Sequence, residues 1–202
     1  MEIRRLDPSC SDWLDYLVTG DEKWVLYVNY PHKHQWLKLE QEGVPTPRPE
    51  SEKIMLCCWW NVKGVIHWKL LPRGYTINAD TYCEQLDRVA AKLQGKQRKV
   101  FFLHDNARPH IAKLTQMKLR SLDWTVLPHP PYGSDLIPLN YHLFRSLTHY
   151  LEGRHFIDDN KLKTDVQSFF DHKSPVFDRE EIYKLPGCWQ HIVDTDGGYV
   201  CD

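Results

Sequence analysis

The sequence predicts an α/β domain in which helices cover both faces of one mixed β-sheet, and two observations support this fold class. After an early hairpin, short apolar runs typical of strands alternate with longer segments of helical periodicity, in the order β-β-β-α-β-α-β followed by helices. The 202 residues, 42% of them hydrophobic and 26% charged, suffice for one substantial domain with a core but not for two large ones.

The first three strands are predicted from apolar runs on either side of a long polar segment. Residues 24–29 form the first strand. Residues 54–60 are continuously apolar, as expected of a strand covered on both faces, and a turn at 61–64 leads into a third strand at 65–71. Residues 30–53 contain four Pro and show little periodicity, which predicts a long loop or arm.

A helix is predicted after the hairpin, because Thr76 or Asn78 can cap it and apolar residues then recur with helical spacing. These apolar residues are Tyr82, Leu86, Val89 and Leu93. A buried strand is expected at 100–104 and a short one at 124–127, with a helix at 110–122 between them. The residues that this helix is expected to turn inward are Ile111, Leu114 and Leu122.

The C-terminal part is predicted to be helical after a rigid connector at 128–131, whose prolines exclude a helix. Pro138 suits the first turn of the next helix. The core stripe of that helix is expected to be Leu139, Leu143, Leu147 and Leu151. Further helices near 159–171 and 179–193 close the domain.

Composition argues against several classes of protein. The formal net charge of −1 is not that of a strong general binder of polyanions. No apolar stretch approaches about 18 residues and no signal-peptide core is present, so neither a membrane-spanning nor a secreted protein is expected. The six Cys form no C-x-x-C pair, which favours a reducing intracellular compartment, with Cys57 and Cys58 as small buried hydrophobes. The eleven His lack partners at structural-zinc spacing.

Two carboxylates stand beside apolar runs, where a desolvated charge has to be paired or bound to a metal. Asp105 follows the run 100–103, and Asp21 lies just before the first predicted strand. Asn140 lies at the start of a helix, with 34 residues between it and Asp105. Taken singly, each acid has a simpler explanation, because Asp is frequent in turns and helix caps. Asp135 is interpreted as a cap at a helix N-terminus.

The segments around these residues resemble the catalytic core of mariner-family DNA transposases. The matching motifs are Thr-Gly-Asp-Glu-Lys-Trp at 19–24, His-Asp-Asn-Ala-Arg-Pro-His at 104–110, Pro-Pro-Tyr-x-x-Asp-Leu-x-Pro-x-x-Tyr-His-Leu-Phe at 130–144 and Leu-Pro-Gly-Cys-Trp-Gln at 185–190. The resemblance covers roughly residues 15–200. The family normally has aspartate at the third catalytic position, so this chain resembles an Asp-Asp-Asn variant.

The resemblance implies a ribonuclease-H-like fold, in which the first strand and the strand after the first helix lie side by side and bring Asp21 and Asp105 together. It also implies that Asp21, Asp105 and Asn140 are the catalytic residues and hold two Mg²⁺ or Mn²⁺ ions. Asp21 would bridge both ions, and Asn140 would hold the second one weakly because it replaces a carboxylate. A loss of about 3 kcal/mol of transition-state stabilisation would slow cleavage roughly 100-fold.

The partner that the resemblance implies is DNA, as transposon ends and target, with a possible homodimer and neither a membrane nor a small-molecule cofactor. The candidate DNA-binding residues are Arg108, His110, Lys113 and Arg48. A wider phosphate-facing patch, or equally a set of solvated helix faces, is predicted for Lys92, Lys96, Arg98, Lys99, Lys118 and Arg120. Localisation to the nucleus follows from the DNA substrate.

The domain organisation is predicted from the same resemblance. Residues 1–18 are a lead-in too short for the helix-turn-helix region of the family, so residues 19–202 are expected to be the catalytic domain of a longer protein or a gene remnant. The loop 30–53 would reach towards the partner subunit and DNA.

Two hypotheses about function stay open. The first is a divalent-metal-dependent DNA nuclease core with mariner-type chemistry, weakened by Asn140, in which nicking survives better than complete transposition. The second is a catalytically silent, transposase-derived DNA-binding or dimerisation module. A glycosidase would need a paired acid and nucleophile in a sugar cleft, which nothing beyond the aspartates supports.

Overall fold

The computed structural model describes residues 11–30, 51–129 and 137–195, and within these ranges five strands form one mixed sheet in the order β3-β2-β1-β4-β5. The strands are β1 (Leu17–Leu26), β2 (Lys53–Asn61), β3 (Gly64–Leu70), β4 (Phe101–Leu103) and β5 (Thr125–Val126). The central strand β1 pairs antiparallel with β2 and parallel with β4. The chain therefore has the mixed sheet that the order of its elements predicts.

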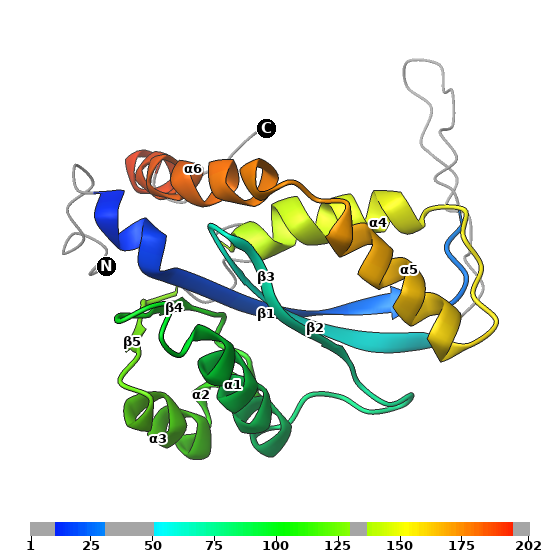
Figure 1. Ribbon diagram of the computed structural model, residues 1–202, viewed down its shortest axis with the longest axis horizontal. Helices are drawn as coiled ribbons and strands as arrows, with labels where there is room; N and C mark the ends of the chain where they lie inside the picture. Colours follow the sequence, from blue (N-terminus) through cyan, green and yellow to red (C-terminus); the bar gives the residue numbers. More distant parts are fainter. Residues whose placement is uncertain (1–10, 31–50, 130–136, 196–202) are drawn as a thin grey trace.

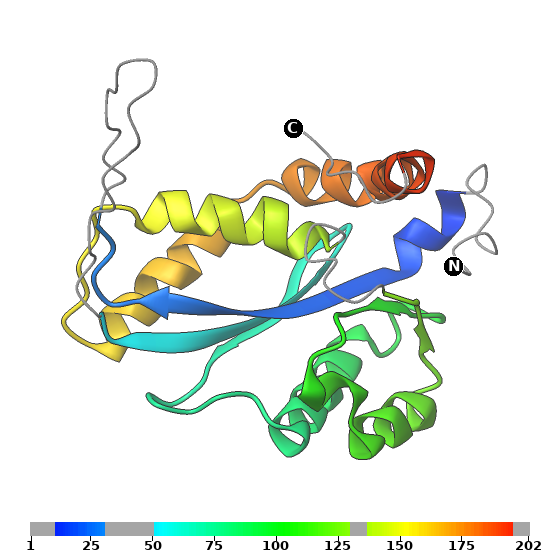
Figure 2. The ribbon, with the colours of Figure 1, turned by 180° about the vertical axis from the view of Figure 1, so that it is seen from behind.

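Helices lie on both faces of this sheet, as predicted. They are the 3-10 helix η2 (Ser11–Tyr16), α1 (Ala79–Leu93), α2 (Arg108–Ile111), α3 (Lys113–Ser121), the π-helix η4 (Leu139–Phe144), α4 (Arg145–Leu151), α5 (Asp159–Asp171) and α6 (Pro175–Asp194). Figures 1 and 2 show α1, α2 and α3 on one side of the sheet and α4, α5 and α6 on the other. The sheet is thus the middle of three layers, and both of its faces are buried.

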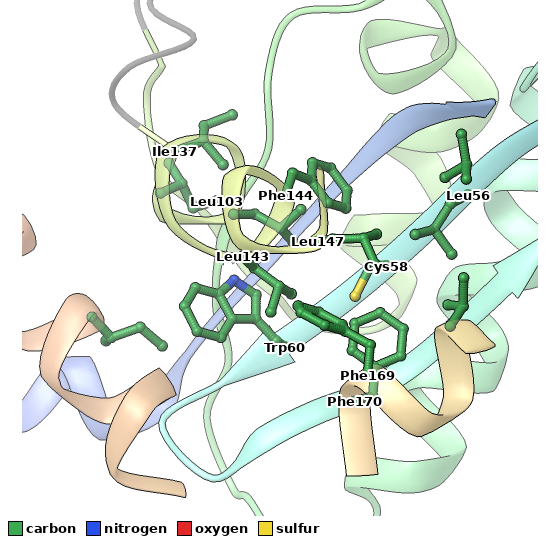
Figure 3. Packing of buried hydrophobic residues seen from close by; sticks show 14 of the residues in the cluster. Leu56, Cys58, Trp60, Leu103, Ile137, Leu143, Phe144, Leu147, Phe169 and Phe170 are labelled. Atoms are coloured by element: carbon green, nitrogen blue, oxygen red, sulfur yellow. The ribbon is translucent and has the colours of Figure 1, made fainter. Parts of the chain in front are cut away.

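The two cores are built from alternate residues of the same strands, because successive side chains of a strand point to opposite faces. In β2, Cys58 and Trp60 belong to the core beneath α4–α6, whereas Cys57 and Trp59 belong to the core beneath α1. Figure 3 shows the first of these cores, in which Cys58 and Trp60 lie among leucines and phenylalanines from the helices. Both cysteines are fully buried, as predicted from the apolar run.

Position 20 has to be glycine, because the side chain of Trp59 packs directly against its Cα. A Cβ atom at this position would lie 2.3 Å from the indole Nε1 of Trp59, which is inside any real contact distance. Trp59 is fully buried and has no room to shift at low cost. The sequence Gly-Asp at 20–21 therefore combines a packing requirement on one face of β1 with a carboxylate on the other.

Several elements match the sequence predictions closely. The hairpin of β2 and β3 is present, and α1 begins after Asn78, whose side chain accepts a hydrogen bond of 2.8 Å from the backbone N–H of Thr81. Helix α5 has the predicted bounds. The predicted core stripe is fully or almost fully buried at Leu139, Leu143, Leu147 and Leu151.

Three predicted elements need correction. The first strand begins at Leu17 rather than at residue 24, so Asp21 lies inside β1 and not before it. The predicted helix 110–122 is divided at Ala112, whose backbone is extended (φ −58°, ψ 145°). The break turns Ile111 and Leu114 outward, 50% and 45% exposed, and leaves Thr115 and Leu119 as the buried residues of α3. Helix α6 begins at residue 175 rather than 179.

The predicted loop 30–53 falls almost wholly outside the described residues, and so do Arg48 and Asp135.

Candidate active site

The pairing of β1 with β4 brings the two predicted catalytic aspartates to the same place. Thr19 of β1 is opposite Leu103 of β4 in the last pair of the ladder, and Asp21 and Asp105 each follow two residues further along the chain. The two carboxylates are close enough for the charge of Asp105 to raise the pKa of Asp21. The two residues are 84 positions apart in the chain (105 − 21). Because parallel strands carry equivalent positions side by side, the sheet and not the local sequence creates this pair.

Asn140 lies on η4, a π-helix that packs against β1, the strand that carries Asp21. The backbone N–H of Asn140 donates to the carbonyl of Ile137 over 3.0 Å, and Leu139 and Leu143 beside it are fully buried. The buried leucines hold η4 against the sheet, which leaves Asn140 half-buried at the level of the central strand. Single π-helical turns within helices are rare and occur frequently at functional sites.

Asp21 is a buried carboxylate with little compensation from the protein. It is 7% exposed, and its Oδ1 accepts a 2.7 Å hydrogen bond from the backbone N–H of Glu22. Burial raises the pKa of Asp21 to about 7, and the negative charges of Glu22 and Asp105 add to this effect. Burial and the two neighbouring negative charges make the ionised form of Asp21 unfavourable. A bound cation would stabilise that ionised form.

Asp105 is held in place by the chain that follows it. Its Oδ1 accepts hydrogen bonds from the backbone N–H of Ala107 over 2.9 Å and from Nδ1 of His110 over 2.5 Å. Burial alone would raise the pKa of Asp105, but these hydrogen bonds outweigh it and lower the pKa below the usual value. Because both bonds end on Oδ1, the second oxygen Oδ2 is the one that Asp105 can offer to a ligand.

His110 lies between two carboxylates. Its side chain is fully buried, with Nδ1 at Asp105 and Nε2 at 3.1 Å from Oε2 of Glu22. Burial would lower the pKa of His110, but the contacts with both carboxylates raise it to about 10, so the ring carries a proton and a positive charge at neutral pH. The prediction that His110 contacts DNA does not agree with this placement, because no part of the side chain reaches the surface.

Glu22 is the residue of this network that the sequence reasoning missed. Neighbouring residues on a strand face opposite sides of the sheet, so Glu22 faces the α1 side whereas Asp21 faces the η4 side. The one available signal was an acidic residue next to Asp21 within a strand that is buried on both faces. That signal was lost when β1 was expected to begin only after Asp21.

A second layer of aromatic side chains supports His110. The hydroxyl of Tyr82 lies 3.0 Å from Nδ1 of His104, and the rings of Tyr82 and His110 have centroids 4.2 Å apart. Burial lowers the pKa of His104 to about 3, and the positive charge of His110 acts in the same direction. His104 is therefore uncharged and positions its neighbours through packing and one hydrogen bond.

The basic residues of the prediction divide into two groups. Arg108 and Lys113 are exposed at the starts of α2 and α3, close to Asp105 in the chain. Lys118 is instead paired with Asp87 over 2.9 Å, and Nζ of Lys92 donates to the carbonyl of Ile66 over 2.8 Å. Arg108 and Lys113 are therefore better placed than Lys118 and Lys92 to meet a phosphate.

Lys23 was not in the predicted site and lies beside it. It follows Asp21 by two residues on β1 and so shares its face of the sheet, and its Nζ is 5.8 Å from the ring centroid of Phe144 in η4. Burial lowers the pKa of Lys23, and the charge of Asp21 opposes that shift. The position gives the site one cationic group next to its anionic pair.

The donor atoms fit a hard divalent cation. Asp21, Asp105 and Asn140 all offer oxygen, the donor that Mg²⁺ and Mn²⁺ prefer. The negative charge around Asp21 that raises its pKa is also consistent with a cation site. In the described part of the chain, no three His, Cys, Asp or Glu side chains are grouped so as to hold a metal ion.

Comparisons with known proteins agree with this fold. The family described as Transposase (partial DDE domain) matches residues 26–102. The chain is 40% identical to the human histone-lysine N-methyltransferase SETMAR over 195 residues and 39% identical to the Mariner Mos1 transposase of Drosophila mauritiana over 197 residues. Each match covers 93% of this chain, which spans 28% of the length of the first relative and 57% of the second.

Solved structures show the same likeness in three dimensions. The crystal structure of the catalytic domain of Mos1 mariner transposase superposes with a TM-score of 0.80 at 36% identity, over 96% of this chain and 90% of that chain. A pre-cleavage Mos1 transpososome gives a TM-score of 0.85 at 38% identity, over 96% of this chain and 60% of that chain. The architecture is thus that of a DDE-type transposase catalytic domain with a ribonuclease-H-like fold.

Within that class, the chain belongs to the mariner family of transposases.

No helix in the described ranges is long and apolar enough to cross a membrane.

Proposed function

We propose that this chain is a mariner-type transposase catalytic core that cleaves DNA phosphodiester bonds with divalent metal ions. The observation that carries the proposal is the parallel pairing of β1 with β4, whose ladder ends two residues before Asp21 and Asp105 and so supports their being neighbours. The burial of Asp21, which raises its pKa together with the charges of Glu22 and Asp105, supports it, because a buried carboxylate is stabilised by a cation or by a proton. We place the start of the catalytic domain at η2 rather than at the expected residue 19, because Leu14, Leu17 and Val18 are buried in its cores.

The residues that would hold the ions are Asp21, Asp105 through its Oδ2, and Asn140 through its amide oxygen. Mos1 paired-end complexes have been solved with Mn and with Mg, which supports the choice of ions. When bound, such ions would supply activation of a water molecule and stabilisation of the leaving oxygen. The third position offers no charge, so the ligand set carries two negative charges instead of three, and the second ion binds more weakly.

The other residues of the site bind and orient. The charged His110 fixes the rotamer of Asp105, so that the free carboxylate oxygen keeps one direction. Lys23 places a positive charge beside the pair, where a scissile phosphate would sit. Arg108 and Lys113 are exposed near Asp105 and would bind the phosphate backbone without reading its sequence.

A nicking assay on supercoiled DNA, in Mg²⁺ and in Mn²⁺, tests the proposal. It compares the native chain with Asp105→Ala, Asn140→Asp and the matched control Asp171→Ala, an exposed acid on α5. We expect the native chain and the control to nick, Asp105→Ala to be inactive, and Asn140→Asp to be faster by up to about 100-fold if the amide costs about 3 kcal/mol. Equal rates for the native chain and Asp105→Ala, together with no gain in Asn140→Asp, would overturn the proposal.

A catalytically silent DNA-binding or dimerisation module is the alternative, and the amide at position 140 favours it. The same assay separates the two functions. A native chain as inactive as Asp105→Ala, combined with activity in Asn140→Asp, identifies a silenced enzyme whose fold and ligand positions are intact.

The proposed partners are DNA ends, target DNA and a second copy of the chain. Mos1 has been solved as a paired-end complex with left transposon end and as a strand transfer complex, which supports transposon ends and target as substrates. Strand transfer by the 3′-hydroxyl that cleavage leaves would follow in the family manner. The arm 30–53, with Arg48, would reach the partner subunit and DNA, and a DNA substrate places the protein in the nucleus.

A further inference from the structure

A groove lies beside the candidate active site, between the α2–α3 helices and the outer strands β4 and β5. Its volume is about 620 Å³, within the range of sites that hold small organic groups. It starts at Asn106, the residue after Asp105, and extends to Arg120 in the last turn of α3. We call it the β5 groove. Figure 1 shows these elements together at the end of the sheet that carries β5.

The walls of the β5 groove carry apolar side chains that the protein leaves in water. Ile111 on α2 is 50% exposed and Val126 on β5 is 42% exposed, and both line the groove together with Trp124. A break in the helix at Ala112 produces the exposure of Ile111, since a continuous helix was expected to bury it. Exposed apolar residues gathered at a groove indicate a binding surface for a flat apolar group.

Two side-chain amides stand on the same walls and are fixed in direction. Nδ2 of Asn106 donates to the carbonyl of His129 over 2.7 Å, and Nε2 of Gln116 donates to the carbonyl of Ile111 over 3.1 Å. In each case the NH₂ group is engaged with the backbone. The amide oxygen is then the part that can accept a hydrogen bond from an amino group of a ligand.

The described lining of the β5 groove holds no carboxylate. No Asp or Glu is among the described residues that line it, Arg120 supplies an exposed positive charge, and the buried His104 and His110 form part of its floor. A smaller depression beside β3, of about 330 Å³, combines Asp171 and Asp178 with three lysines, Lys63, Lys92 and Lys173. The β5 groove can therefore accept an anionic ligand without bringing it against a carboxylate of its own wall.

We propose that the β5 groove holds one unpaired nucleotide of a DNA strand, with its base against Ile111 and Val126 and its phosphate at Arg120. Apolar walls, fixed hydrogen-bond acceptors and an exposed cation are features that can hold a base and its phosphate. His104 and Asn106, the two neighbours of Asp105 in the chain, both line the groove, so it lies next to the candidate active site. The inference rests on the proposed function in that it takes DNA as the ligand.

Binding of single-stranded DNA in EDTA tests the groove without involving metal ions or cleavage. The probe is a fluorescently labelled oligo(dT) of about 12 nucleotides, a length that one such domain covers. A second probe of equal length is abasic and keeps only the sugar-phosphate chain. The variant is Ile111→Asp, and the matched control is Leu114→Asp, which places the same charge at a 45% exposed apolar residue on the adjacent helix α3, outside the groove lining.

We expect Ile111→Asp to weaken oligo(dT) binding by about tenfold, since a base would have to leave a groove that now holds a carboxylate. Leu114→Asp should change the dissociation constant by less than about twofold, and the abasic probe should bind the two variants equally. Val126→Asp, on the opposite wall, should repeat the loss if Ile111→Asp fails to fold, as judged by circular dichroism.

Equal losses in Ile111→Asp and Leu114→Asp would show a general charge effect and overturn the proposal. So would an abasic probe that binds as tightly as oligo(dT) to the native chain. The outcome is distinguishable from that of the nicking assay, because the metal site takes no part in EDTA. If the chain nicks DNA but fails this binding test, the proposed function stands and only the proposal for the β5 groove is overturned.

Discussion

Asp21 and Asp105 carry the same side chain on neighbouring strands, and yet the fold shifts their pKa values in opposite directions. Asp21 lies inside β1, where burial and two nearby carboxylates raise its pKa to about 7. Asp105 lies two residues beyond β4, where a charged histidine and a backbone N–H lower its pKa. One carboxylate is stabilised by the protein, and the other is not.

The difference shows how a site for cations can be built without making the fold unstable. A strand interior offers Asp21 almost no hydrogen-bond donors, because the backbone groups around it are engaged in the sheet. The turn after β4 offers Asp105 free N–H groups and the ring of His110. Asp105 is thereby fixed before any ligand arrives, whereas Asp21 remains the anion that a ligand would neutralise.

The largest expected effect on stability comes from removing the positive charge of His110, which contacts both Glu22 and Asp105. In His110→Ala, Glu22 and Asp105 lose their common cation, and we expect the free energy of unfolding to fall by about 3 kcal/mol. Urea denaturation without metal measures the change. The matched control is His149→Ala, whose side chain is 69% exposed and whose loss should cost less than about 0.5 kcal/mol. Equal effects would show that His110 is not the centre of an ion-pair network.

Asp105→Asn should destabilise the metal-free protein by about 2 kcal/mol. The amide offers a weaker acceptor to the charged His110, which then stays buried beside Glu22 alone. The measurement is again the free energy of unfolding in urea. A neutral or stabilising result would mean that the hydrogen bonds to Oδ1 do not outweigh the burial of Asp105.

Asp21→Asn should have the opposite sign and raise the stability of the metal-free protein by about 1 kcal/mol at pH 8. The substitution removes a desolvated charge that Glu22 and Asp105 repel, and it keeps the shape of the side chain. Thermal unfolding in EDTA at pH 8 measures the gain. Cleavage activity should disappear in the same variant, so stability and activity change in opposite directions. A loss of stability would contradict the account of Asp21 as an uncompensated anion.

The smallest expected change in stability is at Asp178, which lies away from the candidate active site and so also serves as a control. Burial raises its pKa to about 6, with Lys173 acting in the opposite direction. Because the folded pKa is above the unfolded one, the charged carboxylate weakens the fold above pH 6, and protonation relieves this as the pH falls towards 4. Asp178→Asn should therefore add about 0.5 kcal/mol at pH 7, and the gain should vanish by pH 4. Nicking should be unchanged.

Elements with strong local signals were predictable from the sequence. The apolar run of β2, the turn into β3 and the capped periodicity of α1 needed no information from distant residues. The start of β1 was missed because the segment Thr19–Lys23 is polar, and only the packing of its neighbours shows that it is a central strand. The helix break at Ala112 also leaves no proline or glycine signal, so the faces of Ile111 and Leu114 were assigned wrongly.

The candidate site was predictable in part. The resemblance indicated Asp21, Asp105 and Asn140, and the strand pairing that brings the two acids together follows from the fold. The contact of Glu22 with His110 was not predictable, since it requires the register of the sheet and the position of α2 at once. His110 was assigned to the DNA surface for the same reason, because its motif shows proximity to Asp105 but not burial.

Because β1 pairs with β4, the distance between Asp21 and Asp105 does not depend on how many residues connect them in the chain. The path from Asp21 to Asp105 leaves through the hairpin and α1 and returns on the adjacent strand, so residues inserted into its loops do not alter the separation of the carboxylates. Asn140 has no such freedom. One residue added in η4 before Asn140 would rotate it around the helix axis, away from its present place against β1. Loops between the first two ligands can therefore acquire new lengths and new contacts during evolution, while the turn that carries the third cannot.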